Sequence, residues 1–290
     1  MDITRKQKLQ GIRYILCAAF FFALMNLFVK LAGDLPVWQK SFFRNIVAAF
    51  VAMGVMIKRR EKPSLNKKAE NYLYLFLRAF IGTIGVLCNF YAIGQMNIAD
   101  ASMLNKLSPF FAMIFSIFLL KEKPKKMEWF AVILAFTGAL FVIKPSFQME
   151  SIPAFLGFFG GMCAGFAYTC VRRLGQNGVK GNVIVLGFSV FSCLFAIPGM
   201  AVTYQPMEWI QSASLLLAGV SAAGGQFSVT AAYTKAPAKE ISVFDYTQVV
   251  FAAIISFVVL GDLPDIYSFF GYAIVIGTAV WKWRYGMKGE

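Results

Sequence analysis

Four ionisable side chains lie well inside long apolar stretches of this 290-residue chain: Arg44, Arg78, Lys106 and Asp245. Inside a membrane each would cost about 2.5–3.5 kcal/mol on insertion scales unless paired or hydrated, so such residues mark binding sites or ion pairs. Three bases and one acid leave a formal charge of plus two, which favours an anionic or zwitterionic ligand. Arg44 and Lys106 are therefore candidates to hold a carboxylate or phosphate, for which arginine offers a planar, bidentate donor.

The single acid, Asp245, has two interpretations. It couples protons or contacts a cationic group of a ligand, or it forms a structural ion pair with one of the three bases. Nearby positive charge keeps a carboxylate ionised, which weighs against simple proton coupling through Asp245. Arg78 lies only about seven residues from the start of its predicted span, so we expect its side chain to reach back to the membrane surface.

Neutral polar side chains at mid-span depth complete the candidate substrate site. Asn105, beside Lys106, and Tyr246, beside Asp245, are expected to help orient a ligand, together with Gln226. Four amide or hydroxyl side chains either contact the ligand or hydrogen-bond between helices: Asn26, Asn89, Tyr168 and Gln226.

The composition assigns the chain to a lipid bilayer. Hydrophobic residues make up 59% and charged residues only 14%, whereas soluble domains have about a quarter charged. The five cysteines all lie in apolar segments, where we expect them to serve as small packing residues. The chain has no histidine, the commonest metal ligand, and no Walker A loop or nucleophile elbow. We therefore expect no metal, no cofactor and no enzymatic activity.

Ten apolar stretches of membrane-spanning length are predicted at residues 11–31, 37–57, 72–94, 98–120, 127–144, 152–171, 182–203, 210–233, 238–260 and 266–285. The first is too long for the apolar core of a signal peptide and should stay in place. When loops alternate between sides, 22 of the 28 Lys and Arg fall on one side and three on the other. The positive-inside rule then predicts a multi-pass inner-membrane protein with both termini cytoplasmic, and the positive charge orients the chain and does not indicate nucleic-acid binding.

Residues 104–124 and 244–264 resemble one another at an offset of 140 positions, with six identities in 21 residues. This repeat divides the chain into two five-helix halves, 1–147 and 148–290. Because five is odd, the second half crosses the membrane in the opposite sense, so the fold class is an all-α polytopic membrane protein of two inverted repeats. In this register Asn105 matches Asp245 and Lys106 matches Tyr246, which should bring two polar pairs to a common axis.

Proline and glycine predict local features of the spans. Ser108-Pro109 should break the fourth span, and Pro198 is a candidate break in the seventh. Three glycines spaced by four residues, Gly157, Gly161 and Gly165, should let the sixth span approach a neighbour within the same chain. We expect a monomer, with a dimer as the alternative.

Three segments carry a family resemblance: ADA-x(7)-PFF within residues 78–124, GALFVIKP at 138–145 and FDYTQVVFAAIISFVVLGDLPD at 244–265. They resemble EamA-type members of the drug/metabolite transporter superfamily across nearly the whole chain. The resemblance implies ten helices, a central cavity and alternating access. Similar members export amino acids and metabolites, import riboflavin or carry S-adenosylmethionine. One departure is Gln248, because a basic residue often follows the DYT stretch in similar sequences.

The expected function is secondary active transport of a small polar or amphipathic organic metabolite such as an amino acid, a vitamin or a compound like S-adenosylmethionine. The expected partners are that small molecule and the surrounding lipids. A flippase or scramblase for an anionic lipid is the alternative. A membrane-embedded enzyme or structural subunit is the third class, and no motif in the sequence favours it.

Overall fold

A computed structural model describes residues 4–62, 64–65, 68–95, 98–143, 151–261 and 264–288. Lys144, the predicted boundary between residues 147 and 148, and Asp262 lie outside this description, as do the side chains of the ADA motif. All elements of the described chain are helices: α1 (Arg5–Leu31), α2 (Val37–Lys58), α3 (Ala69–Gln95), α4 (Ile98–Asn105), α5 (Ser108–Leu120), α6 (Lys126–Ile143), α7 (Ser151–Gln176), α8 (Gly181–Thr203), α9 (Trp209–Lys235), α10 (Ala238–Asp245), α11 (Thr247–Leu260) and α12 (Ile266–Lys288).

The helices coincide with the predicted spans. Within the described residues, nine helical segments are long and apolar enough to cross a membrane, with α4 and α5 sharing one crossing and α10 and α11 another. The remaining helix, α12, is of similar length but carries Lys282 and Arg284 near its end, which lowers its hydropathy. Large apolar side chains such as Phe50, Phe118 and Trp209 are more than half exposed on the outer surface, as lipid contact requires. The protein is therefore an all-α, polytopic membrane protein.

Two spans are broken near their middle. Helix α4 ends at Asn105 and α5 begins at Ser108, as Ser108-Pro109 predicts. Helix α10 ends at Asp245 and α11 begins at Thr247, a second break that contains no proline and was not predicted. The candidate break at Pro198 is wrong, because α8 continues through this residue to Thr203.

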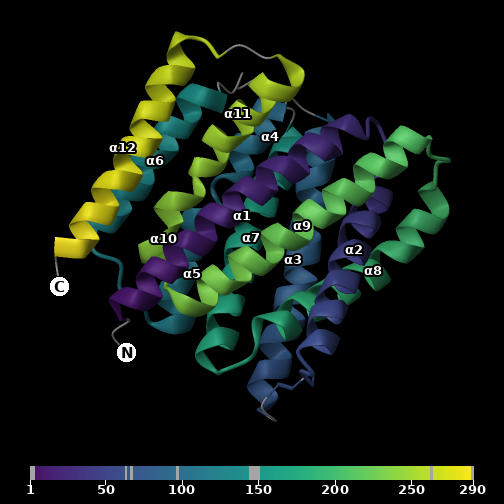
Figure 1. Ribbon diagram of the computed structural model, residues 1–290, viewed down its shortest axis with the longest axis horizontal. Coiled ribbons are helices and arrows are strands. Elements are labelled where there is room, and N and C mark those ends of the chain that lie inside the picture. The colour runs from purple at the N-terminus through teal and green to yellow at the C-terminus, as the bar shows by residue number, and fades with distance from the viewer. Residues whose placement is uncertain are drawn as a thin grey trace.

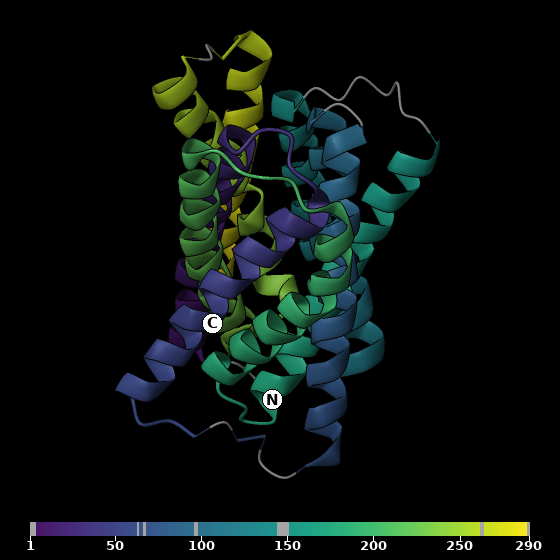
Figure 2. The same cartoon turned by 90° about the vertical axis from the view of Figure 1, so that its right-hand side faces the viewer.

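Helices distant in sequence lie side by side. Helix α1 packs along α9, α3 along α7, α2 along α8, and α6 along α12, the last pair forming one edge of the molecule (Figure 1). The view turned by 90° shows α2 running obliquely across the front of the molecule, where it contacts α8 and α9 (Figure 2). Glycine permits the closest approaches: a Cβ at Gly161 would lie 2.6 Å from the carbonyl oxygen of Leu104 in α4. The glycines of α7 thus face helices of the same chain, which confirms the predicted intramolecular packing.

Both termini lie at the same end of the molecule, which we call the basic end (Figure 1). It comprises the start of α1, the end of α12 and the segments that connect α2 to α3, α5 to α6, α7 to α8 and α9 to α10. Most of the Lys and Arg residues fall in these segments. Thr4 begins the first helix with a capping box, in which its hydroxyl accepts from the Gln7 amide and the Gln7 side chain accepts from the Thr4 amide.

Candidate functional site

A cavity of about 200 Å³ lies between the two parts of the chain joined at residues 144–150, and it is lined by side chains from both. This volume is an order of magnitude more than one water molecule needs. Eight of the nine substrate-site residues expected from the sequence line it: Asn26, Arg44, Asn89, Asn105, Lys106, Tyr168, Gln226 and Asp245. The ninth, Tyr246, does not line the cavity and is completely buried behind it.

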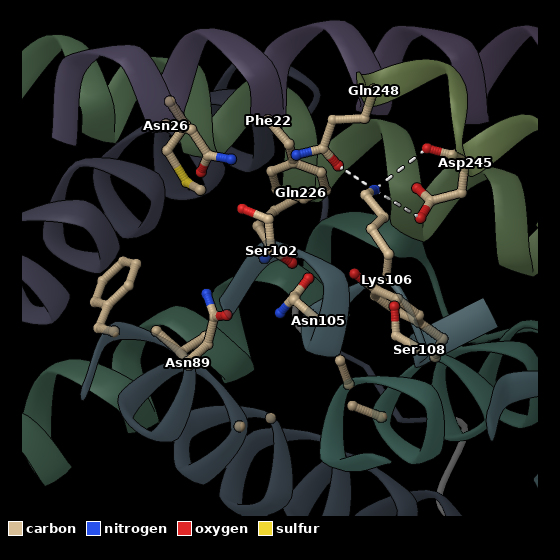
Figure 3. Close-up of a pocket in the computed structure, with 18 of the residues that line it drawn as sticks. Phe22, Asn26, Asn89, Ser102, Asn105, Lys106, Ser108, Gln226, Asp245 and Gln248 are labelled. Atoms are coloured by element: carbon tan, nitrogen blue, oxygen red, sulfur yellow. Dashed lines mark hydrogen bonds and ion pairs between the residues drawn. The ribbon is translucent and has the colours of Figure 1, made fainter. Parts of the chain in front are cut away.

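Lys106 extends from the break between α4 and α5 to the break between α10 and α11. Its Nζ lies 3.2 Å from Asp245 Oδ2, 3.3 Å from the Asp245 carbonyl oxygen and 2.7 Å from Gln248 Oε1 (Figure 3). Of the alternatives open for Asp245, the structure contains the ion pair with Lys106. The charges of this pair offset one another, so the pair contributes no net charge to the cavity.

A residue at the break between α10 and α11 stabilises the backbone at the break between α4 and α5. The hydroxyl of Tyr246 donates to the carbonyl oxygen of Lys106 at 3.1 Å, and Lys106 N donates to Ser102 O at 3.0 Å. A helix break leaves backbone carbonyls without intrahelical partners, and inside a membrane these need another donor. Tyr246, which was expected to help orient a ligand, does not line the cavity and instead contacts the backbone from which Lys106 projects.

Arg44 and Arg78 form the other charged part of the cavity wall. Their exposed fractions are only 5% and 3%. Arg78 Nη2 donates to Gln226 Oε1 at 2.9 Å, and its guanidinium lies 4.1 Å from the centre of the Phe188 ring. The absence of a side chain at Gly82, one turn along α3, leaves room for the Arg78 guanidinium.

The predicted extension of Arg78 to the membrane surface is therefore wrong. Its distance from the start of the predicted span would have allowed that direction, but α3 begins earlier, at Ala69, and so places Arg78 further along its helix. An amide acceptor and an aromatic face both lie toward the interior. Arg78 therefore lines the cavity, as do Ser102 and Gln248, which the sequence analysis did not assign to the candidate site. For Gln248 the signal was its departure from the family pattern.

Neutral polar groups line the rest of the cavity. Asn26, Asn89 and Asn105 lie around the same space, on the side away from the Lys106 contacts (Figure 3). The Oδ1 atom of Asn89 is buried and accepts no hydrogen bond from the described residues. The ring of Tyr168 stacks on Tyr233 with 4.9 Å between centroids, which fixes its orientation. The cavity therefore offers both hydrogen-bonding and charged groups in a body that is otherwise apolar.

Below the cavity, the basic end is held together by ion pairs between the two parts of the chain. Lys8 lies 2.8 Å from Glu240, Lys282 lies 3.6 Å from Glu128, and Arg173 lies 2.7 Å from Glu70. Two further contacts of this kind are Arg172 with Glu122, at 3.3 Å, and Lys180 with Glu61, at 3.5 Å.

The Glu122 contact lies in the segment between α5 and α6. Burial raises the pKa of Glu122, and the adjacent Arg172 partly opposes that effect. Arg172 Nη1 also donates to the carbonyl oxygen of Thr234 at 3.3 Å, so α7, the α5–α6 segment and the end of α9 meet at one point. The closure of the basic end is therefore continuous across several helices.

An apolar helical body with a polar internal cavity is typical of integral membrane transport proteins. The chain belongs to the EamA-like transporter family, whose sequence model matches residues 9–144 and again residues 151–281. This is a family of transporters and not of enzymes.

Relatives match along almost the whole chain. A pseudopaline exporter of Pseudomonas aeruginosa is 29% identical over 93% of this chain and 94% of its own length. A riboflavin transporter of Vibrio cholerae is 25% identical over 92% of this chain and 91% of its own length. A member of solute carrier family 35 from Homo sapiens is 25% identical over 96% of this chain and 81% of its own length. A solved crystal structure shares the fold, with a TM-score of 0.81 at 15% identity over 94% of this chain and 96% of that one.

Proposed function

We propose that this protein is a secondary active transporter that moves a small polar or amphipathic organic metabolite across the bacterial inner membrane by alternating access. The observation that carries the proposal is the cavity, which gathers Lys106, Asp245, Arg44 and Arg78 at the junction of the two parts of the chain. Midplane sites at the junction of two repeats are the usual location of substrate in secondary transporters. The relatives named for export of pseudopaline and transport of riboflavin support a dissolved organic cargo.

The proposed architecture is ten membrane-spanning helices in two inverted repeats, 1–147 and 148–290. Structural landmarks recur at the offset of 140 residues. The breaks lie at Lys106 and Tyr246, and α5 and α11 each end at a left-handed residue, Lys121 with φ 55° and Gly261 with φ 74°. Helix contacts also occur in equivalent pairs: α1 with α9 corresponds to α3 with α7, and α5 with α7 corresponds to α1 with α11.

The conformation supports alternating access with the basic end closed. The cavity lining extends from the two breaks to Asn26, Ile93 and Ile143, near the ends of α1, α3 and α6 that point away from the basic end. In the other direction lie the ion pairs of the basic end. Because Lys and Arg concentrate there, we infer that the basic end, with both termini, is cytoplasmic and that the cavity extends toward the opposite face.

The moving bodies are groups of helices in space and not the halves of the sequence. Helix α7 packs on α3 and α5, and helix α9 packs on α1 and α2. A rocking motion must therefore carry helices of both repeats together. The Lys106 contacts join two such groups and lie where both broken spans meet, so they are placed to change when the groups move.

Transport by purified protein in proteoliposomes tests this function. Liposomes loaded with a bacterial metabolite extract, followed by mass spectrometry of what crosses the membrane, need no prior choice of substrate. We expect at least one polar metabolite to cross with wild type, and Asp245→Asn and Lys106→Ala to abolish that flux while the proteins remain folded and monodisperse. Full transport by both variants would refute the site assignment. Flip of a labelled anionic lipid without metabolite flux would favour the flippase alternative.

A further inference from the structure

Two buried guanidinium groups in the cavity lack an anionic partner among the described residues. No hydrogen-bond acceptor in that part of the chain reaches Arg44 Nε, Arg44 Nη1 or Arg78 Nε, although these atoms are buried. Among the described side chains, the one that accepts from Arg78 is the neutral amide of Gln226. The carboxylate that lines the cavity, Asp245, is occupied by Lys106.

The two arginines act on the same space. Both line the cavity together with Tyr168. Like charges that share one cavity repel one another, and burial adds a large desolvation cost for each ion. Buried polar groups in proteins are almost always hydrogen-bonded, so unpaired donors at this depth need a function that offsets their cost.

We propose that Arg44 and Arg78 form an oxyanion subsite, which holds a carboxylate or phosphate group of the transported metabolite. This inference rests on the proposed function and assigns the substrate class: a small molecule with one anionic end and a neutral, hydrogen-bonding remainder. The anion accepts from the free guanidinium N–H groups and cancels the positive charge that the cavity otherwise keeps. The neutral end faces the carboxamides of Asn26, Asn89 and Asn105 (Figure 3).

The assignment separates the cations of the cavity into two roles. Lys106 has three oxygen acceptors within 3.3 Å and needs no ligand. The arginines have too few acceptors. A substrate anion therefore binds at the arginines and leaves the Lys106–Asp245 pair intact, whereas the sequence alone favoured Arg44 and Lys106 as the anion-binding pair.

Matched probes that carry or lack an oxyanion test the subsite. The unfolding midpoint of the detergent-purified, full-length protein is measured with glycolate against glycolamide, succinate against succinamide, and inorganic phosphate against chloride. We expect at least one oxyanion to raise the midpoint by a few degrees at saturation while its neutral or halide partner does not. The carboxylate and phosphate arms then distinguish the two sources of the anion.

Arg44→Gln and Arg78→Gln should each lower the affinity for that oxyanion by roughly 10-fold to 100-fold, since a hydrogen bond to a charged group contributes about 1.5–3 kcal/mol. The matched control is Lys30→Gln, which removes a positive charge from an exposed position outside the cavity and should leave the affinity unchanged. Without ligand, Arg44→Gln should unfold at the same temperature or higher, because it removes an uncompensated buried charge.

Three results would overturn the subsite: no oxyanion gives a charge-dependent shift, the shift persists in both arginine variants, or ligand-free Arg44→Gln is strongly destabilised. The last result would make Arg44 a structural residue. Failure of transport is a separate outcome, because oxyanion binding without flux refutes the proposed transporter and leaves the subsite standing. Flux restricted to neutral or cationic metabolites refutes the subsite and leaves the transporter.

Discussion

The two ends of the molecule are held together by different chemistry. At the basic end, ion pairs such as Lys8–Glu240 and Lys282–Glu128 connect the first half of the chain to the second. At the opposite end, the corresponding contact is neutral: Gln39 donates to the Gln205 carbonyl oxygen at 2.9 Å and accepts from the Gln205 amide at 3.1 Å.

Under the proposed alternating access, this difference explains how a closed end can reopen. When the basic end opens, water solvates the separated ions, and this solvation offsets the lost attraction within each pair. A closure of the same extent made from interdigitated apolar side chains would have to expose that surface to water on opening. Opening of the basic end would therefore expose ions that water solvates, whereas the Lys106–Asp245 pair, buried to a similar extent, joins the two broken spans at the cavity.

Glu240→Gln should have the largest effect of the three variants, because Glu240 contacts both Lys8 and Lys282 at the basic end. We expect the basic end to open about tenfold more often, since losing about 1.4 kcal/mol of closure changes a population tenfold. The measurement is maleimide labelling of Ser242→Cys in a cysteine-free background, because Ser242 is fully buried on α10, between Glu240 and Asp245 in the sequence. Unchanged labelling would show that these ion pairs do not close the end.

Gln39→Ala should have an intermediate effect, on stability and not on opening. It removes two hydrogen bonds to the backbone of residue 205, which together contribute about 1–3 kcal/mol at about 0.5–1.5 kcal/mol each. Gln205→Ala is the matched control, because residue 205 contributes only backbone atoms to these bonds and should keep them. The check is the unfolding midpoint of each variant, and equal midpoints for the two would contradict the assigned role of this contact.

Glu70→Gln should have the smallest effect, although its 2.7 Å contact with Arg173 is the shortest of the ion pairs described here. Both side chains are more than a third exposed, so water and salt screen the attraction and the change should stay below about 1 kcal/mol. Labelling of Ser242→Cys in this variant should match the parent protein. A change as large as that of Glu240→Gln would show that the burial of an ion pair does not determine how much it contributes to closing the basic end.

Much of the fold was predictable because hydrophobic length and proline chemistry are local. The predicted spans coincide with the helices, and Ser108-Pro109 correctly marked the first break. The break at Tyr246 has no local signal: it forms where the Tyr246 hydroxyl and the Lys106 carbonyl meet across the molecule. The reverse error occurred at Pro198, where proline predicted a break but α8 continues through this residue.

For the candidate site, the sequence predicted which residues line the cavity better than it predicted which of them contact one another. A charged or amide side chain in an apolar span is costly in contact with lipid, so eight expected residues face one cavity. Which cation Asp245 takes depends on tertiary distances that spacing does not contain, as does the inward direction of Arg78. Their roles in binding substrate remain predictions that the variants above address.

The packing of α7 and α9 also bears on how the protein is made. Each helix from α1 to α6 has its most extensive contact with a helix that follows residue 150. While the ribosome is still synthesising the second half, the inserted first half lacks those neighbours and its small-residue faces are occupied by lipid or by insertion machinery. A chain that stops after α6 therefore contains half of the sequence and almost none of the tertiary structure, and quality control in the cell should treat it as unfolded.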